Sequence, residues 1–218
     1  MALEHFFPYQ NKIHKHPNFP CYDLDFNTLI NPIQTLNCNL KKNESSIKQK
    51  FSIFTQKYNR DFSFVYTDAS KSNGRIGFGV NIPNINLSFF SRLPGEISIT
   101  KAENVAIYQA IKIIISKDIK KAIIFSDSLN AISKIKNPKI SATDDSISLK
   151  TKNLILSAYK KGFDILISWI PGHSDIPGNV EADLLAKIGT GLNIPLAMLL
   201  DSQDDLNSIK EKLLLNLK

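Results

Sequence analysis

Residues 169–187 read WIPGHSDIPGNVEADLLAK, a loop rich in glycine and proline that leads into an expected helix carrying Asp183. Upstream lie three other acidic residues, each at the end of an expected strand or near the start of an expected helix: Asp68 in FVYTDAS, Glu103 in ITKAENVAIYQAI and Asp127 in AIIFSDSLNAI. Carboxylates without thiolates are the ligands that Mg²⁺ prefers. Four of them brought together would make a metal site, so we expect the chain to be organised around residues 61–190.

The composition is that of a globular protein with an excess of positive charge. The 218 residues are 43% hydrophobic, which is enough to build the core of one domain of common size. A formal net charge of +7 favours a polyanionic partner such as nucleic acid, although lysines spread over a solvated surface would give the same number. Cys21 and Cys38 build neither a disulfide framework nor a metal knuckle, which favours a reducing compartment. Because no apolar run approaches the ~18 residues of a membrane span, we expect an intracellular protein, of the cytoplasm or nucleus, that contacts no membrane.

Three strands are expected at the start of the domain. In the first, the period of two places four residues on one face: Phe62, Phe64, Tyr66 and Asp68. The segments RIGFGV and NLSFFSRL follow as two more strands, each after a turn marked by asparagine with glycine or proline. Short turns between consecutive strands predict an antiparallel meander.

Helices and strands alternate in the second part of the domain. A helix opens at Thr100, and Glu103 lies on its apolar stripe. The run AIIFSD is a short, continuously apolar strand that ends at Asp127, as expected of a buried parallel strand. The remaining expected elements are helices at 129–136 and 149–159, a strand at 164–170 and a helix at 180–188. The resulting order is βββαβααβα, or βββαβαβα if the helices at 129–136 and 149–159 are separated differently. Either order predicts an α/β domain with a mixed five-stranded sheet flanked by helices.

The two ends of the chain give weaker patterns. Residues 1–60 show no sustained period, so we expect a poorly structured connector, in which residues 51–58 form a short helix or strand. In the tail, 191–218, an amphipathic helix is expected over 204–217. Its apolar side comprises Leu206, Ile209, Leu213 and Leu217.

Together these motifs resemble a type 1 ribonuclease H domain over residues 61–190. The resemblance is carried by YTDAS, AEN, FSDS, the W-x-P-G-H loop and G-N-x-x-A-D-x-L-A, in the family's order. The last two look like the version found in polyproteins of non-LTR retrotransposons. This chain departs from that version at Val180, where Glu is usual, and at Asp175, where a small residue is usual. Residues 1–60 show no reverse-transcriptase signature, which indicates an excised or domesticated fragment, or a partial gene.

The resemblance implies an α/β ribonuclease H-like fold and an endonuclease that cuts the RNA strand of RNA·DNA hybrids. It implies two Mg²⁺ ions as cofactors, with Mn²⁺ as a possible substitute. Asp68 would bridge both ions, Asp183 would complete the ion that activates water, and Glu103 with Asp127 would hold the other. His173 would assist proton movement or product departure. A reverse-transcriptase domain is an implied partner, and we expect the chain to be a monomer.

Recognition of the hybrid in this family depends on contacts to 2′-hydroxyl groups and to phosphates of the DNA strand. Beside the carboxylates, the candidates for the 2′-hydroxyl contacts are Ser70, Thr100 and Ser128. For phosphates the candidates are Lys71, Arg75 and Lys101. The long basic protrusion of some family members has no clear counterpart in this sequence.

Structural roles compete with the metal site for most of these carboxylates. With Thr100, Glu103 fits a capping box, Asp127 fits a helix N-cap, and Asp183 fits a first-turn acid that complements a helix dipole. Asp68 fits no such role, because a carboxylate on an aromatic strand face is costly to bury without a cation. The competing function is a catalytically silent remnant that binds nucleic acid or a partner through its basic surface.

Overall fold

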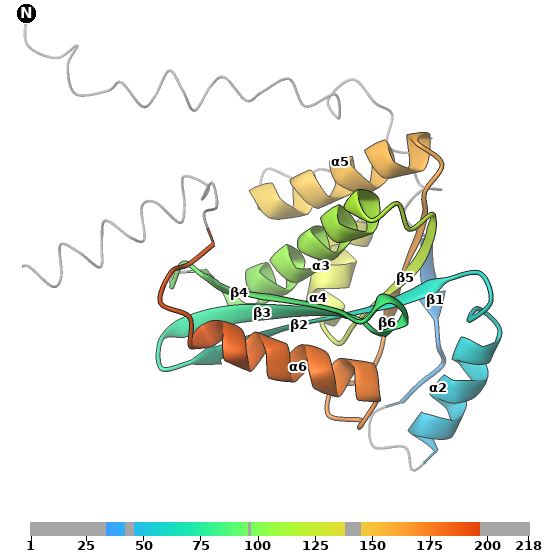
Figure 1. Ribbon diagram of the computed structural model, residues 1–218, viewed down its shortest axis with the longest axis horizontal. Helices are drawn as coiled ribbons and strands as arrows, with labels where there is room; N and C mark the ends of the chain where they lie inside the picture. The colour runs from blue at the N-terminus through green and yellow to red at the C-terminus, as the bar shows by residue number, and fades with distance from the viewer. Residues whose placement is uncertain (1–33, 42–45, 96, 138–144, 197–218) are drawn as a thin grey trace, which may run out of the picture.

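The computed structural model of the chain describes residues 34–41, 46–95, 97–137 and 145–196 (Figure 1). One mixed sheet of six strands, in the order β1-β6-β5-β2-β3-β4, runs through the molecule. The strands are β1 (Gln34–Asn37), β2 (Ser63–Ser72), β3 (Arg75–Ile82), β4 (Leu87–Leu93), β5 (Lys121–Ser126) and β6 (Asp164–Trp169). β2, β3 and β4 form the expected antiparallel meander, with the 3₁₀ turn η2 (Pro83–Ile85) between the last two. β1, β6, β5 and β2 pair in parallel, so the prediction of a mixed α/β sheet is confirmed.

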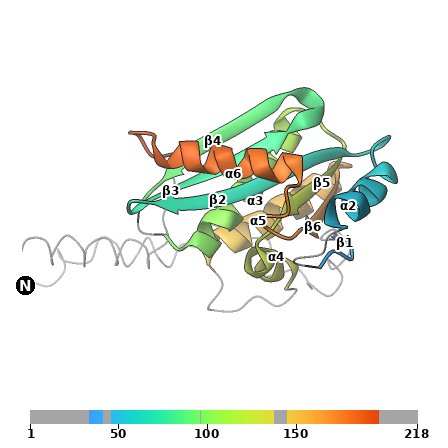
Figure 2. The same ribbon diagram turned by 90° about the horizontal axis from the view of Figure 1, so that it is seen from below.

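The helices form a layer on each face of the sheet (Figures 1 and 2). α3 (Ile99–Ser116), α4 (Leu129–Lys136) and α5 (Ser146–Lys160) cover one face. α2 (Ile47–Gln56) and α6 (Pro177–Thr190) cover the other face, with α2 beside the N-terminal end of α6. The sheet therefore has a hydrophobic cluster on each side.

Alternation along β2 decides which residues enter each cluster. Val65 lies in the cluster under α3, whereas Tyr66 and the partly buried Phe64 lie in the cluster under α2 and α6. Tyr66 stacks on Phe125 of β5 with ring centroids 5.2 Å apart. Successive residues of a strand point to opposite faces of the sheet, so this division confirms the predicted face of the first strand.

The expectation of a poorly structured N-terminal connector is wrong for β1 and for the start of α2, whereas the short helix or strand expected at residues 51–58 is confirmed as a helix over 51–56. β1 adds a sixth strand by pairing in parallel with β6, from Gln34 with Leu166 to Asn37 with Trp169. In α2 the buried Ile47 and Phe51 follow one another by four residues, so the helix has a narrow apolar stripe. A four-residue edge strand is defined mainly by backbone pairing with β6, which local periodicity does not reveal.

Three element boundaries differ from expectation. β2 continues past Asp68 to Ser72, because β3 stays paired with it after β5 has ended. α3 begins at Ile99, with the Ser98 hydroxyl accepting a hydrogen bond from the Lys101 N–H at 3.2 Å. α6 begins at Pro177, since proline is well suited to the first turn of a helix.

After α6 the chain is held against β4 by Arg92. Its Nη1 donates to the carbonyl oxygens of Leu192 at 3.3 Å and Asn193 at 2.8 Å, and its carbonyl accepts from the Leu196 N–H at 2.7 Å. The predicted amphipathic helix at 204–217 lies outside the described residues. Within the described ranges, none of the helices has the length and apolar character to cross a bilayer.

Candidate metal centre

Asp68 and Asp127 come together where the parallel pairing of β2 and β5 stops. The last pair is Thr67 with Ser126, so each aspartate is the next residue on its own strand. Asp68 is 7% exposed, and its Oδ1 accepts a hydrogen bond from the Ala69 N–H at 2.9 Å. Neighbouring parallel strands that end together therefore place two carboxylates at the same edge of the sheet.

The Asp127 position is shaped by the loop after β6. Trp169 Nε1 donates to the Asp127 carbonyl oxygen at 3.0 Å, which fixes the backbone at this point. A Cβ on Gly172 would overlap the Asp127 carboxylate, so the glycine of the W-x-P-G-H loop leaves the space that this side chain needs. Trp169, at the end of β6, and Gly172, in the loop, therefore both help to place Asp127. Asp127 is not the N-cap of α4, because the Ser128 hydroxyl performs that role and accepts from the Ala131 N–H at 3.3 Å.

Glu103 reaches the same edge from α3. It is the fifth residue of the helix and only 6% exposed. Its Oε1 accepts from the Ala69 N–H at 3.2 Å, so one backbone amide joins Glu103 and Asp68. Its Oε2 is buried and has no hydrogen-bond partner among the residues that the structure describes. The capping-box alternative is excluded, because Ser98 caps α3 and Lys101 occupies the position at which a capping-box glutamate would stand.

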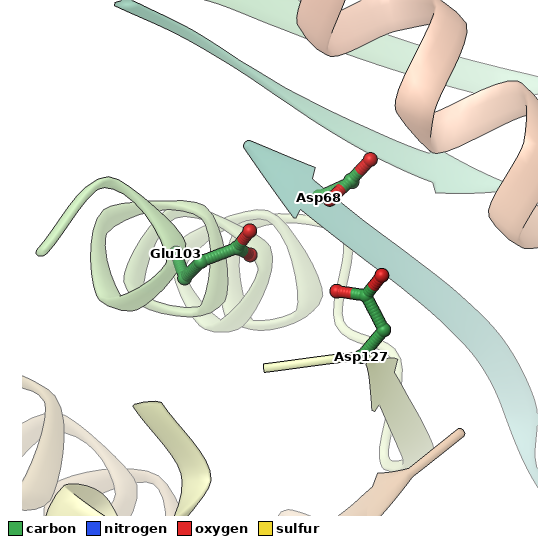
Figure 3. Close-up of side chains that lie close together, drawn as sticks. All are labelled: Asp68, Glu103 and Asp127. Carbon is green, nitrogen blue, oxygen red and sulfur yellow. The ribbon is translucent and has the colours of Figure 1, made fainter. Parts of the chain in front are cut away.

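These three carboxylates form a compact acidic group. Each of Asp68, Glu103 and Asp127 offers an oxygen, and these oxygens lie within 4.8 Å of one another (Figure 3). Burial, followed by the neighbouring Asp127 carboxylate, raises the pKa of Asp68 to about 7. Burial, followed by the Asp68 and Asp127 carboxylates, raises the pKa of Glu103 well above its usual range. Burial and mutual repulsion therefore disfavour the charged forms of both groups, and a bound cation would favour those forms.

Asp183 lies on the same cavity but outside the compact group. It is the seventh residue of α6 and its side chain is 30% exposed, so it does not sit in the first turn as expected. Lys187 Nζ contacts its Oδ2 at 2.6 Å, one turn further along the helix. Asp183 is close enough to Asp68 to contribute to the raised pKa of that group. The dipole alternative does not apply to a residue in the second turn.

Glycines at the contact between α6 and the sheet allow the helix to lie close to β2 and β3. A Cβ on Gly79 would overlap Ala182 and Leu185, and a Cβ on Gly178 would overlap the ring of Tyr66. Because α6 can approach β2 and β3 this closely, Asp183 comes down beside Asp68, whose partner in β3 is Gly79.

His173 stands at the rim of this cavity, which has a volume of about 240 Å³. Its side chain is exposed and its backbone adopts a left-handed conformation, with φ of 53°. The loop is held by the Ser174 hydroxyl, which donates to the Pro171 carbonyl at 2.6 Å, and by the buried Ile176. Asp175 forms an ion pair with Lys48 of α2 at 3.3 Å, so the residue that departs from the expected small side chain is partnered by the N-terminal helix.

Comparison with known proteins agrees with this geometry. The family model for RNase H matches residues 60–190, which is more than half of the chain. The chain belongs to the RNase H family. Ribonuclease H1 of Homo sapiens is 36% identical over 150 residues, and that of Mus musculus is 34% identical over 149. Each match covers 62% of this chain and 52% of the relative, so the chain spans about half the length of the curated relatives it matches.

Among solved structures, the RNase H1 crystal structure from Halobacterium salinarum NRC-1 has 16% sequence identity and a TM-score of 0.42. That comparison covers 58% of this chain and 96% of the archaeal chain.

The acidic group of this RNase H domain fits a divalent metal ion. All of the available donors are hard carboxylate oxygens, as Mg²⁺ requires. The buried Oε2 of Glu103, which lacks a hydrogen-bond partner, is the strongest sign, since a buried carboxylate oxygen is costly to leave unpaired. A bound cation would also relieve the repulsion that raises the pKa values of Asp68 and Glu103.

The residues expected to contact substrate spread over a wider area of the RNase H domain. Ser70 and Lys71 follow Asp68 on β2, and Arg75 opens β3 across the hairpin from Ser72. Thr100 and Lys101 lie in the first turn of α3, both partly buried. Ser128 is the remaining candidate for a substrate contact, and its hydroxyl already accepts a hydrogen bond as the N-cap of α4.

Asn179 is a site residue that our sequence reasoning did not select. It lines the cavity beside Asp183 and is 6% exposed, and within the described part of the chain its buried Oδ1 has no hydrogen-bond partner. The signal was present in the G-N-x-x-A-D motif, where the asparagine precedes the aspartate by four residues and therefore shares its helix face.

Proposed function

We propose that this protein is a metal-dependent endonuclease that hydrolyses the RNA strand of RNA·DNA hybrids. The observation that carries the proposal is the compact group of Asp68, Glu103 and Asp127, with Asp183 on the same cavity, within a domain of the RNase H family. The curated relatives are named ribonuclease H1, which supports the same activity for this chain.

Each carboxylate is assigned a place in a site for two Mg²⁺ ions, with Mn²⁺ as a substitute. Two ions held by such a cluster would neutralise charge at phosphorus, activate the attacking water and stabilise the departing oxygen. Asp68 is central, because its carboxylate neighbours those of Glu103, Asp127 and Asp183, which come from three different elements. We assign Asp68 to both ions, Glu103 and Asp127 to one, and Asp183 to the other.

Asp183 must exchange partners for this assignment to hold. In the structure its Oδ2 accepts from Lys187 Nζ, and Lys187 is an exposed side chain that can turn to solvent. Exposed ion pairs between residues four apart on a helix contribute only about 0.3 to 0.5 kcal/mol. Release of Lys187 is therefore a small cost for recruiting Asp183 to the site.

His173 is positioned to move a proton at the rim of the site. Its exposed imidazole lies on the same cavity as Asp68 and Asp127, on a loop whose two ends are anchored by Trp169 and Ile176. We assign it the transfer of a proton to or from a group entering or leaving the site. Replacing it with alanine should slow turnover by about 10²- to 10⁴-fold, the usual contribution of a general acid or base.

Cleavage of a labelled RNA·DNA hybrid in Mg²⁺, beside the Asp68→Asn variant, tests the proposal. The wild-type protein should cut the RNA strand only, and the variant should lose at least about 10³-fold in rate, or roughly 4 kcal/mol of transition-state stabilisation. Glu181→Gln, a change on the same helix outside the carboxylate set, is the matched control. Wild-type cleavage no faster than that of Asp68→Asn would instead support the catalytically silent reading.

The finer assignments are part of the same proposal. We infer that the domain is of the retrotransposon type, from its W-x-P-G-H loop and the G-N-x-x-A-D-x-L-A helix, and that it functions beside a reverse-transcriptase domain as a monomer. Sedimentation of the purified chain tests the monomer. Ser70, Thr100 and Ser128 are assigned to 2′-hydroxyl groups, and Lys71, Arg75 and Lys101 to phosphates. A DNA·DNA duplex should bind without being cut, since it lacks the 2′-hydroxyl groups.

A further inference from the structure

The positive charge of the chain is concentrated in the residues that precede the RNase H domain. Residues 34–60 contain six basic residues and one acidic residue, and so carry a formal charge of +5 out of +7 for the whole chain. Five of these basic side chains are exposed: Lys41, Lys48, Lys50, Lys57 and Arg60. The family model begins at residue 60, so β1 and α2 lie outside the part it matches.

A cleft of about 340 Å³ opens between the loop after β1 and the outer side of α2. We call it the β1–α2 cleft. It is lined by Asn37, Cys38 and Asn39 on one side and by Lys50, Ile53, Phe54, Lys57 and Tyr58 on the other. The lining therefore combines two amide side chains, two lysines and an apolar floor. Polynucleotide strands are bound in such grooves, with cations on the phosphates and apolar or aromatic groups against bases and sugars.

The geometry of the cleft suits a chain of regularly spaced phosphates. Lys50 and Lys57 are seven residues apart on α2 and thus about 10 Å apart along its axis. Three nucleotide steps of a stacked strand cover about the same distance. The opposite wall is fixed by an Asx turn, in which the Asn39 N–H donates to Asn37 Oδ1 at 2.8 Å and Asn39 adopts a φ of 53°. Ile53, 52% exposed, stands between the two lysines.

The two elements that form the cleft, β1 and α2, both contact residues next to the metal centre. Lys48, at the N-terminal end of α2, contacts Asp175, which lines the metal cavity together with His173. β1 runs parallel to β6, and Asn37 pairs with Trp169, whose indole holds the Asp127 backbone. In both ribbon views α2 lies next to the N-terminal end of α6 (Figures 1 and 2). A strand that left the site past the His173 loop would therefore pass close to α2.

We propose that the β1–α2 cleft binds the sugar-phosphate backbone of the substrate beyond the cleaved position. Lys50 and Lys57 contact phosphates, the amides of Asn37 and Asn39 contact sugars or base edges, and Ile53 packs against an unpaired base. β1 and α2 are then an added nucleic-acid-binding element that supplies affinity to the RNase H domain. This inference rests on the proposed function for the identity of the substrate, whereas the cleft itself is tested by binding alone.

The test measures binding of fluorescent nucleic acids to the full chain carrying Asp68→Asn, in EDTA, so that cleavage plays no part. The probes are a short RNA·DNA hybrid and the same hybrid with a single-stranded DNA extension at either end. Lys50→Ala with Lys57→Ala is compared with Lys160→Ala and Lys161→Ala, two exposed lysines where α5 ends, on the face of the sheet opposite to α2. Thermal unfolding of both double variants checks that they fold.

The expected result is a loss of affinity specific to the cleft. An extension at one end should tighten binding, and the Lys50/Lys57 variant should lose that gain. The slope of log K against log salt concentration should become shallower by about 1.4 to 1.8 for this variant. That change corresponds to a loss of affinity of about 25- to 60-fold at ~0.1 M salt. The Lys160/Lys161 variant should keep the wild-type slope. Equal slopes for both double variants, or no effect of an extension at either end, would overturn the proposal.

The two proposals fail in different ways. If the Lys50 and Lys57 changes weaken binding but the wild-type protein does not cut the hybrid, the cleft proposal is supported and the nuclease proposal is refuted. Hybrid cleavage with a kcat/KM that is unaffected by the Lys50 and Lys57 changes would do the reverse.

Discussion

The Asp68 carboxylate is buried among acidic groups, and this makes the metal-free protein sensitive to pH. Its folded-state pKa is raised to about 7, from a usual value near 4 in an unfolded chain. Between these values the folded state holds a proton that the unfolded state has released. The contribution of Asp68 to the free energy of unfolding must therefore fall as pH rises from about 4 to about 7 and level off above that range, and the raised pKa of Glu103 acts in the same direction.

Urea unfolding in EDTA at about pH 5 and about pH 8 measures this effect. The wild-type protein should be less stable at the higher pH by about 2 to 4 kcal/mol. Asp68→Asn should reduce this difference, because the amide carries no charge in either state. Asp61→Asn, at an exposed position, is the control and should keep the wild-type dependence. Stability that is constant or rises over this range would contradict the role assigned to burial.

Gly172 offers a second prediction at the scale of one residue. The methyl group of Gly172→Ala would occupy the space of the Asp127 carboxylate. Displacement of a catalytic group by about 1 Å can cost about 10²-fold in rate, so we expect hybrid cleavage to fall by 10- to 100-fold. The control is Gly191→Ala at the end of α6, where the backbone is helical and the nearest atom leaves more room. Equal cleavage rates for the two variants would show that Asp127 does not need this space.

At the scale of elements, α2 is attached to the sheet by aromatic packing. Phe51 is 7% exposed and lies with its ring centroid 5.1 Å from that of Phe125, in an edge-on contact. Phe54 and Tyr58 continue the contact toward Phe62, at the beginning of β2. The helix therefore covers the part of the sheet that α6 leaves open, and belongs to the fold of the domain.

Phe51→Ala should lower the free energy of unfolding by about 3 to 5 kcal/mol, the usual cost of emptying a buried aromatic site. Ile53→Ala, on the exposed side of the same helix, should change it by less than about 0.5 kcal/mol. Chemical denaturation of both variants at one pH provides the comparison. Similar values for the two would mean that α2 does not pack on the sheet as described.

For the whole molecule, the boundary of the folding unit differs from the boundary of the family match. Residues 34–41 and 46–60 contribute a strand to the sheet and four buried side chains to one of its two clusters: Cys38, Leu40, Ile47 and Phe51. Without them, the α2 side of β5 and β6 would be exposed to water. An apolar surface of this kind promotes association of chains.

A fragment of residues 34–196 should therefore unfold cooperatively and remain monomeric, whereas a fragment of residues 61–190 should be markedly less stable or aggregate. Thermal unfolding by circular dichroism, with gel filtration of both fragments, measures the difference. If the shorter fragment were as stable as the longer one, β1 and α2 would be peripheral to the fold.

Local patterns were sufficient for most of the fold and for the identity of the acidic residues. Period-two alternation in β2 predicted the buried faces of Val65 and Tyr66, and the apolar stripe of α3 predicted that Glu103 would face the sheet. These features depend on side chains close together in sequence, so the sequence by itself determined them. The motifs also predicted that Asp68, Glu103 and Asp127 would converge.

Tertiary structure alone decided the remaining features, because each depends on contacts between distant residues. β1 is formed by backbone pairing with β6, and the pattern of its four side chains does not predict this pairing. Asp183 shares a cavity with Asp68 because Gly79 of β3 lets α6 lie close to the sheet. The basic side chains of residues 34–60 acquire a shared surface only once β1 and α2 dock on the sheet, and it is this docking that brings them beside the acidic site.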